Sequence, residues 1–268
     1  MFGHEISTTW KAEVNQKCIV GSSTSRRESK RIGSIDAARG LAILGVVIFH
    51  FVWDLEFAGF ISGIAFHPIW LAFGKSLAGS FMILVGVSLV LAHQDGFRLH
   101  AFTKRLFVIA LAAAIISIVT WFIFPGSFIY FGILHSIAVA SLVGLVFLKM
   151  PSLVTFMIGV FVFVAPIFYT STVFDTRWLA WIGFASIPPR SNDFVPVFPW
   201  LGLTLIGLSL TKLAKEKGWE TQVFTAAKPT FVAISLEWLG QKSLAIYLIH
   251  QPVMLAFILP ISSLFSDR

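Results

Sequence analysis

The sequence predicts an all-α protein, a polytopic membrane bundle of about seven transmembrane helices. Of the 268 residues, 57% are hydrophobic and only 12% are charged, whereas soluble domains have about 45–50% apolar and about 25% charged residues. The apolar residues also form stretches of roughly 17 to 25 residues, the length that crosses a bilayer as a helix. This composition excludes a soluble enzyme with a single core and a disordered chain. The single cysteine, Cys18, excludes a disulfide scaffold.

The chain divides into a leader and a membrane domain. Residues 1–33 are polar and basic and contain no apolar stretch long enough for a signal-peptide core, so we expect a disordered cytoplasmic leader. Residues 34–268 form the predicted transmembrane domain. Its apolar stretches lack the alternation of barrel strands, and backbone groups in lipid must be paired internally, so we expect helices. The predicted spans are residues 37–57, 69–92, 104–124, 128–148, 151–170, 195–213 and 231–261.

The last of these spans is too long for one simple crossing and is interrupted at Gly240. Two alternatives are open for it, a broken helix or an eighth short helix. The distribution of basic residues fixes the expected orientation. With seven spans, the leader and the breaks near residues 98–105, 149 and 212–228 fall on one side, and short loops rich in Lys and Arg stay in the cytoplasm.

The basic breaks therefore predict a cytoplasmic N-terminus, and we expect a multi-pass protein of the plasma (inner) membrane. They also account for most of the formal charge of +7, which comes from 20 Lys+Arg against 13 Asp+Glu. A nucleic-acid partner is not needed to explain this charge.

Ionisable residues stand out against the apolar background, and such residues inside a membrane are costly and usually functional. His50 lies toward the outer end of the first span, and His67 lies in the loop before the second. His135 and His250 lie in the fourth and last spans, and Asp193 precedes the sixth. Each alone is also compatible with packing at the interface or in a loop. Together, on the outer side, they indicate a shared site.

On the inner side, Asp36 and Arg39 are three residues apart and can pair on one helix face, which is also typical of a helix end at the lipid interface. A phosphorylated donor would need cations, which Arg39, Lys104, Arg105 and Lys242 supply, although the topology already demands basic residues there. Lys75, inside the second span, can reach the interface with its long side chain or bind an anionic group.

The inventory of side chains favours general-base chemistry. A metal site would show two ligands at helical spacing or paired cysteines, and the sequence has neither, so we expect no metal. Nucleophilic hydrolysis would show a G-x-S-x-G elbow, which is also missing. A general base needs only a histidine of near-neutral pKa beside the acceptor and a partner that orients it.

The segment Arg31–Trp53, RIGSIDAARGLAILGVVIFHFVW, resembles the opening signature of the transmembrane acyltransferases related to heparan-alpha-glucosaminide N-acetyltransferase. In that signature an arginine is followed by Ile/Val-Asp, two residues, Arg-Gly, and an apolar helix ending in Asn or His before an aromatic. Asp36, Arg39, Gly40 and His50 occupy these places.

The resemblance extends over most of residues 31–260. His67 stands three residues before Trp70, and the segments YFGILHSIA, DFVPVFPWLG and GQKSLAIYLIHQPV look like those of the small prokaryotic members.

The resemblance implies a helical bundle that moves an acetyl group from cytoplasmic acetyl-CoA, as co-substrate, to an amine or hydroxyl of a sugar or glycan on the outer face. By position, His67 corresponds to the family's catalytic histidine and His50 to the neighbouring catalytic asparagine. Asp193, His135 and His250 are expected to support them. Arg39, Lys104 and Arg105 are the expected binding residues for the donor.

Three departures from the family pattern matter. His50 replaces an amide, Lys75 stands near an aspartate of the eukaryotic relatives, and the region of His135 and Ser136 differs from their Gln-Arg. The chain also includes no luminal domain to hold a heparan-like polymer, so we expect another glycan or a lipid-linked sugar as the acceptor. The expected partners are the lipid bilayer, acetyl-CoA and this acceptor, and a homodimer stays open.

Two alternatives from other classes also fit. One is a small transporter or proton-coupled permease whose intramembrane His and Lys residues relay protons, although the sequence shows no convincing internal repeat. The other is a membrane subunit that has the fold and lacks the activity. Turnover of acetyl-CoA would distinguish an enzyme from both.

Overall fold

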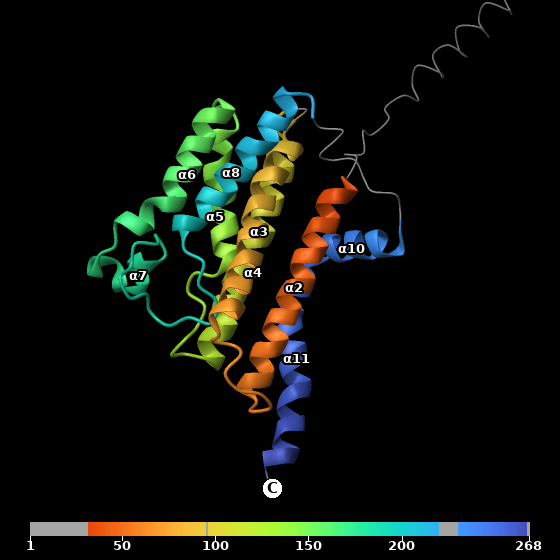
Figure 1. Ribbon diagram of the computed structural model, residues 1–268, viewed down its shortest axis with the longest axis vertical. Helices are drawn as coiled ribbons and strands as arrows, with labels where there is room; N and C mark the ends of the chain where they lie inside the picture. The colour runs from red at the N-terminus through yellow and green to blue at the C-terminus, as the bar shows by residue number, and fades with distance from the viewer. Residues whose placement is uncertain (1–31, 95, 220–229, 267–268) are drawn as a thin grey trace, which may run out of the picture. The chain divides into compact units, whose positions relative to one another are not determined.

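The computed structural model describes residues 32–94, 96–219 and 230–266. In this part of the chain all regular secondary structure is helical, as predicted, and β pairing is limited to two isolated bridges. The predicted leader lies outside the described residues, apart from its last two positions. The helices are α2 (Gly33–Phe57), α3 (Pro68–Ala92), α4 (Leu99–Ile123), α5 (Ile133–Phe147), α6 (Ser152–Phe168), the 3-10 helix η1 (Thr172–Asp175), α7 (Arg177–Ala180), α8 (Val197–Glu216), α10 (Phe231–Gln241) and α11 (Ser243–Ser266) (Figure 1).

The chain is a multi-pass membrane protein. Within the described residues, five helices are long and apolar enough to cross a bilayer: α2, α3, α4, α8 and α11. The apolar helices α5 and α6 are shorter, at 15 and 17 residues, so the count of about seven spans is not confirmed. The last predicted span is two helices, since α10 ends at Gln241 and α11 starts at Ser243, and α10 lies crosswise to α11 (Figure 1).

The contact between α3 and α8 is built on glycines. A Cβ atom at Gly86 would collide with the Thr204 carbonyl, and one at Gly207 would collide with the Ile83 carbonyl. Membrane helices associate by van der Waals packing, and small residues let the two backbones approach closely. The hydroxyl of Thr204 donates to the Met82 carbonyl at 3.0 Å across the same contact.

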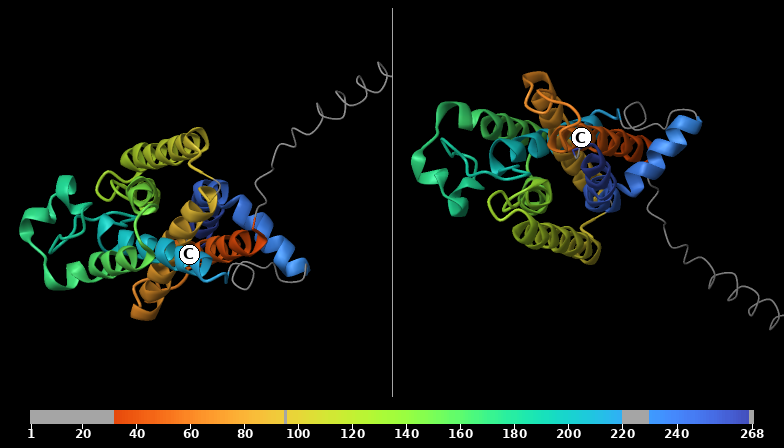
Figure 2. Two further views of the ribbon diagram at one scale, coloured as in Figure 1. Left: turned by 90° about the horizontal axis from the view of Figure 1, so that it is seen from above. Right: turned by 90° about the horizontal axis from the view of Figure 1, so that it is seen from below.

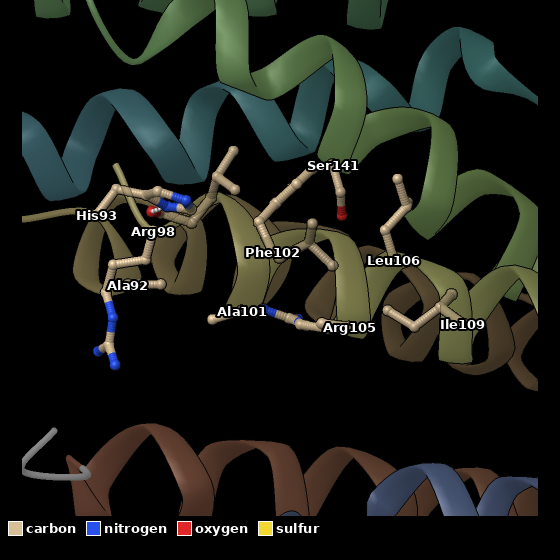
Figure 3. A pocket seen from close by; sticks show the side chains of 11 residues that line it. Ala92, His93, Arg98, Ala101, Phe102, Arg105, Leu106, Ile109 and Ser141 are labelled. Atoms are coloured by element: carbon tan, nitrogen blue, oxygen red, sulfur yellow. Dashed lines mark hydrogen bonds between the residues drawn. The ribbon is translucent and has the colours of Figure 1, made fainter. Parts of the chain in front are cut away.

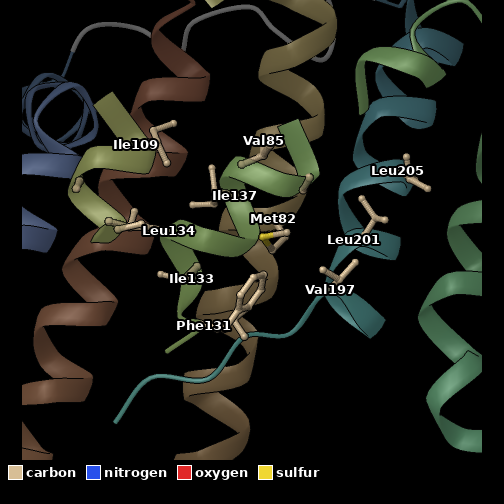
Figure 4. Close-up of a cluster of buried hydrophobic side chains, with 14 of the residues drawn as sticks. Met82, Val85, Ile109, Phe131, Ile133, Leu134, Ile137, Val197, Leu201 and Leu205 are labelled. Atoms are coloured by element: carbon tan, nitrogen blue, oxygen red, sulfur yellow. The ribbon is translucent and has the colours of Figure 1, made fainter. Parts of the chain in front are cut away.

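Large apolar side chains fill the space around this contact. Met82, Leu205 and Leu208 are completely buried. Met82 and Leu205 belong to a cluster that also takes side chains from α4 and α5 (Figure 4). The tight seam between α3 and α8 therefore anchors the helices that surround it.

Both ends of the short helix α5 are capped by side chains from α8 or the loop before it. The Lys212 ammonium donates to the carbonyls of Phe147, Leu148 and Met150 at the C-terminal end. At the N-terminal end, the Asp193 carboxylate accepts from the Ile133 N–H at 2.8 Å. A cation at the C-terminus and an anion at the N-terminus each match the helix dipole, so α5 is fixed at both ends.

The basic residues gather where α3 ends, α4 starts and α8 ends, and we call this the basic end. Lys215 donates to Gln94 at 3.3 Å and joins α8 to the segment after α3, and Ser152 donates to Glu216 at 2.8 Å and joins α6 to α8. Among the described residues, the cations of this end include Arg98, Lys104, Arg105, Lys149, Lys212, Lys215 and Lys217. The end with Phe57, Pro68 and Ile133 is the opposite end.

Helix α2 packs against α10 and α11. At the basic end, Gly40 and Gly240 allow backbone contact, because a Cβ at either position would collide with the Leu236 or Asp36 carbonyl. Farther along, α11 runs parallel to α2, and the side-by-side course of the two helices is visible in Figures 1 and 2. Residues of α2 therefore meet residues about two hundred positions later, which explains how distant histidines come together.

Candidate functional site

His50 on α2 and His250 on α11 form an edge-to-face pair. Their ring centroids are 4.9 Å apart and the ring planes are inclined by 74°. His250 is buried, with 8% of its surface exposed. The structure therefore brings together two of the predicted site residues, from helices at the two ends of the described chain.

Main-chain carbonyls orient both rings in the same way. His50 Nδ1 lies 3.0 Å from the Val46 carbonyl oxygen, and His250 Nδ1 lies 2.8 Å from that of Tyr247. A carbonyl oxygen only accepts, so each Nδ1 carries the hydrogen, and in the neutral ring Nε2 holds the free lone pair. Within the described residues, His250 Nε2 is buried without a hydrogen-bond partner. Both rings are thus oriented as proton acceptors.

Asp193 joins this pair through Tyr247. The same carboxylate oxygen that accepts from the Ile133 N–H also accepts from the Tyr247 hydroxyl at 3.0 Å. The Tyr247 ring in turn lies 5.8 Å, centroid to centroid, from the His250 ring. Burial raises the pKa of the Asp193 carboxyl, while the hydrogen bonds from Ile133 and Tyr247 act in the opposite direction. Asp193 therefore ties the loop before α8 to the helix that carries His250.

His135 lies in the first turn of α5, since the helix starts later than the predicted span. Its Nδ1 accepts from the Gly132 N–H at 3.2 Å, so its Nε2 carries the hydrogen and lies 3.3 Å from the Ser117 hydroxyl. The ring also interacts electrostatically with Asp193. In contrast to the paired histidines, both nitrogens of His135 are occupied by bonds that hold the start of α5.

His67 is the N-cap residue of α3, where it is exposed and accepts from the Ile69 N–H at 3.4 Å. The contacts of the described residues do not join His67 to the histidine pair. Its nearest link is one turn on, where the Trp70 ring stacks on Phe49 beside His50, with 5.7 Å between centroids. The structure therefore gathers His50, His250, Asp193 and His135, and leaves His67 apart from them.

Three residues of this region were not selected from the sequence: Tyr247, Asp54 and Gln251. The Gln251 amide donates to Asp54 Oδ1 at 3.4 Å, and Asp54 is completely buried. Helical spacing is the sequence signal that indicates Asp54 and Tyr247. Asp54 lies four residues after His50 and Tyr247 lies three residues before His250, so each shares a helix face with a predicted histidine.

A small pocket of about 60 Å³ lies at the basic end between α3, α4 and α5 (Figure 3). Arg98, Arg105, His93 and Ser141 supply its polar lining. Arg105 is one of the predicted donor-binding residues, whereas Arg98 is expected only to mark the cytoplasmic side and no sequence pattern indicates His93. Lys104 is exposed and does not line the pocket.

Arg39 lies near this pocket. Its guanidinium pairs with Asp36 at 2.8 Å, as the spacing predicts, and also donates to the Ser88 hydroxyl on α3 at 2.8 Å. Arg39 and Arg105 are close enough to interact electrostatically. Two of the three predicted donor-binding cations are therefore neighbours.

The ionisable groups do not form a metal cage. Across residues 32–94, 96–219 and 230–266, no group of three or more His, Cys, Asp or Glu side chains is close enough to hold a metal ion.

The chain was compared with family models, curated proteins and solved structures. No curated protein and no solved structure matches the chain significantly. The family model of the heparan-alpha-glucosaminide N-acetyltransferase catalytic domain matches residues 31–252, which include the Asp36–Arg39 pair and both paired histidines. The chain therefore belongs to the heparan-alpha-glucosaminide N-acetyltransferase catalytic-domain family, whose activity is that of a membrane acetyltransferase.

Proposed function

We propose that the protein transfers an acetyl group from acetyl-CoA on the cytoplasmic side to an amine or hydroxyl of a sugar or glycan on the outer side. The observation that supports this most is the His50–His250 pair, which offers two Nε2 lone pairs inside a membrane bundle. A histidine that accepts a proton near neutral pH is the group that acyl transfer to an amine or hydroxyl requires.

The proposed orientation follows from the basic end. Short segments rich in Lys and Arg stay in the cytoplasm, so the basic end faces inward and the start of α2 is cytoplasmic. We propose the plasma (inner) membrane as the location. The histidine pair then lies in the outer part of α2, which runs from Gly33 at the basic end to Phe57.

The basic pocket suits the donor. Arg98 and Arg105 contribute to its lining, although Figure 3 shows the Arg98 guanidinium pointing away from the other lining side chains. An arginine guanidinium binds phosphate oxygens in a paired geometry. We therefore assign this pocket to one phosphate group of acetyl-CoA, with Arg39 beside it.

The transfer step balances with one histidine as base. The acceptor nitrogen or oxygen forms a bond to the thioester carbonyl carbon, and a histidine Nε2 takes the acceptor proton. The carbon–sulfur bond then breaks, and coenzyme A leaves as a thiolate that recovers the proton from the imidazolium. A thiol has a pKa of about 8.5, so its departure needs no strong acid. His67 is a second candidate base, supported only by its place in the family pattern.

The test is acetyl transfer by the purified protein in liposomes, with radiolabelled acetyl-CoA and a panel of amino sugars and glycans. We expect release of free coenzyme A with stoichiometric acetylation of an acceptor. His50→Ala and His250→Ala should each lower the rate by about 100-fold or more. His67→Ala decides between the two candidate bases. Uptake of solute without acetyl-CoA turnover would contradict the proposal and favour a transporter.

A further inference from the structure

Asp54 is the most deeply buried ionisable group beside the histidine pair. It is 0% exposed, and it belongs to α2, four residues after His50. One carboxylate oxygen, Oδ1, accepts from the Gln251 amide at 3.4 Å. In the described part of the chain the other oxygen, Oδ2, has no hydrogen-bond partner.

Such a carboxyl group does not favour folding. A buried carboxylate without full pairing costs free energy, and apolar residues of similar volume often replace buried charges without loss of stability. Inside a membrane helix the cost makes a functional role the first hypothesis.

Asp54 lies beside the two histidines, in the contact between α2 and α11. Residues four apart lie on one helix face, so Asp54 and His50 face α11 together. On α11 the partner of Asp54 is Gln251, the residue directly after His250. The contact between Asp54 and Gln251 is thus made next to the ring contact between His50 and His250.

The chemistry of the pair calls for a negative charge. When either ring accepts the acceptor proton, a buried imidazolium forms, and the neighbouring ring cannot neutralise it. An anionic group nearby favours the charged form of a base. The other carboxylate joined to the pair, Asp193, already receives two hydrogen bonds.

We infer that Asp54 is a positioning residue of the proposed acetyl transfer: through Gln251 it holds His250 against His50, and its charge stabilises the proton that the pair accepts. This inference rests on the proposed function. It assigns a role to a residue outside the signature positions Asp36, Arg39, Gly40 and His50.

Other titratable groups on the elements around this part of α2 have to be considered in any pH experiment. Helix α10 contacts α2 around Gly33, Asp36 and Gly40, and its titratable side chain there is Glu237. The groups nearer to Asp54 are His50 and Glu56 on α2, His67 and Lys75 at the start of α3, Tyr247 and His250 on α11, and Asp193 through Tyr247.

The test compares two variants that separate charge from position. Asp54→Asn removes the charge and keeps an oxygen that can accept from Gln251. We expect this variant to lower kcat about 10-fold or more and to move the acidic limb of the pH–rate profile about one unit toward lower pH. Gln251→Ala keeps the charge and removes the contact, so we expect a lower kcat with the acidic limb in its wild-type place. In both variants the KM for acetyl-CoA should stay unchanged, because the basic pocket is untouched.

The control is Asp175→Asn, which removes a carboxylate from η1 that accepts from the Ile187 N–H at 2.9 Å. It should leave kcat and the pH profile unchanged. Asp54→Glu, which restores a carboxylate, should recover part of the rate and return the acidic limb toward the wild-type position.

The outcomes separate the two hypotheses. If the wild-type protein transfers acetyl and Asp54→Asn has a wild-type kcat and pH profile, the role of Asp54 is overturned and the proposed function stands. If Asp54→Asn does not fold, an unchanged kcat in Gln251→Ala likewise overturns the role. If the wild-type protein transfers no acetyl to any acceptor, the proposed function fails and the role of Asp54 fails with it.

Discussion

Two helix seams of this protein are built on opposite principles. Between α3 and α8, Gly86 and Gly207 bring the backbones into contact, and in these two fully described helices the buried residues include no ionisable side chain. Between α2 and α11, His50 and His250 meet inside the bundle, and the buried Asp54 lies one turn away.

The two helix contacts differ in whether their buried polar groups have hydrogen-bond partners. The α3–α8 seam satisfies its polar groups, as Thr204 does with the Met82 carbonyl, and gains stability from close packing. The α2–α11 seam leaves Asp54 Oδ2 and His250 Nε2 without partners among the described residues, which costs stability. The unpaired buried groups of the α2–α11 contact therefore indicate a chemical role. The predictions below test this division, from the largest effect to the smallest.

The largest effect is expected from Gly86→Leu. Its side chain would collide with the Thr204 carbonyl, which is backbone and cannot move aside. Overpacking a tight contact costs about 1–3 kcal/mol and more against backbone, so we expect loss of monodisperse protein on size-exclusion chromatography in detergent. Gly126→Ala is the control, because a Cβ there meets nothing within 4 Å. A stable Gly86→Leu protein would contradict the structural role of this seam.

His250→Ala should affect chemistry and not folding. Removing a proton acceptor is expected to reduce acetyl transfer about 100-fold or more. The thermal midpoint should change little, because removal of a buried nitrogen without a partner offsets the loss of the ring contacts with His50 and Tyr247. Fluorescence-monitored melting and a coenzyme A release assay measure both. His100→Ala, an exposed histidine at the start of α4, serves as control. A large loss of thermal stability without a specific loss of turnover would show that the α2–α11 contact serves mainly to stabilise the fold.

Tyr247→Phe probes the connection between Asp193 and the histidine pair. It removes the hydroxyl that donates to Asp193 at 3.0 Å and keeps the ring. We expect a loss of about 1–3 kcal/mol of stability, because a buried acceptor loses a donor. Turnover should fall about 10-fold, as expected when an orienting partner is lost. Wild-type stability and turnover together would show that the link is not needed.

The smallest effect should come from the basic end. Arg105→Ala removes a cation from the pocket and should raise the KM for acetyl-CoA about 10-fold, with a wild-type kcat, since one charge-assisted hydrogen bond contributes about 1.5–3 kcal/mol. Steady-state kinetics measure both constants. Lys217→Ala is the matched control, because Lys217 is an exposed cation of the same end outside the pocket lining. Equal effects of the two variants would indicate a general charge effect.

The sequence predicted the helical class and most helix positions because apolar length is a strong signal in a membrane protein. It did not predict the short lengths of α5 and α6, since α5 starts only at Ile133, after an extended segment that pairs with the loop before α8. The break near Gly240 was noticed, and the structure resolves it into a crosswise α10 and a long α11.

The clustering of the candidate side chains was predicted in part. His50, His250 and Asp193 were chosen as costly polar residues on one side, and the structure joins them. The roles of Tyr247 and Asp54 depend on the parallel course of α2 and α11, which no local pattern encodes. The catalytic role of His67 stays a prediction.

The most direct test of the central claim is the acetyl-transfer rate of the double variant His50→Ala/His250→Ala, compared with each single variant and with the wild type in liposomes. Residues that act as one unit show grossly non-additive effects. If the two histidines act together as one proton acceptor, the double variant should lose no more activity than the more damaging single variant. A double variant with wild-type transfer, or with losses that simply multiply, would contradict it.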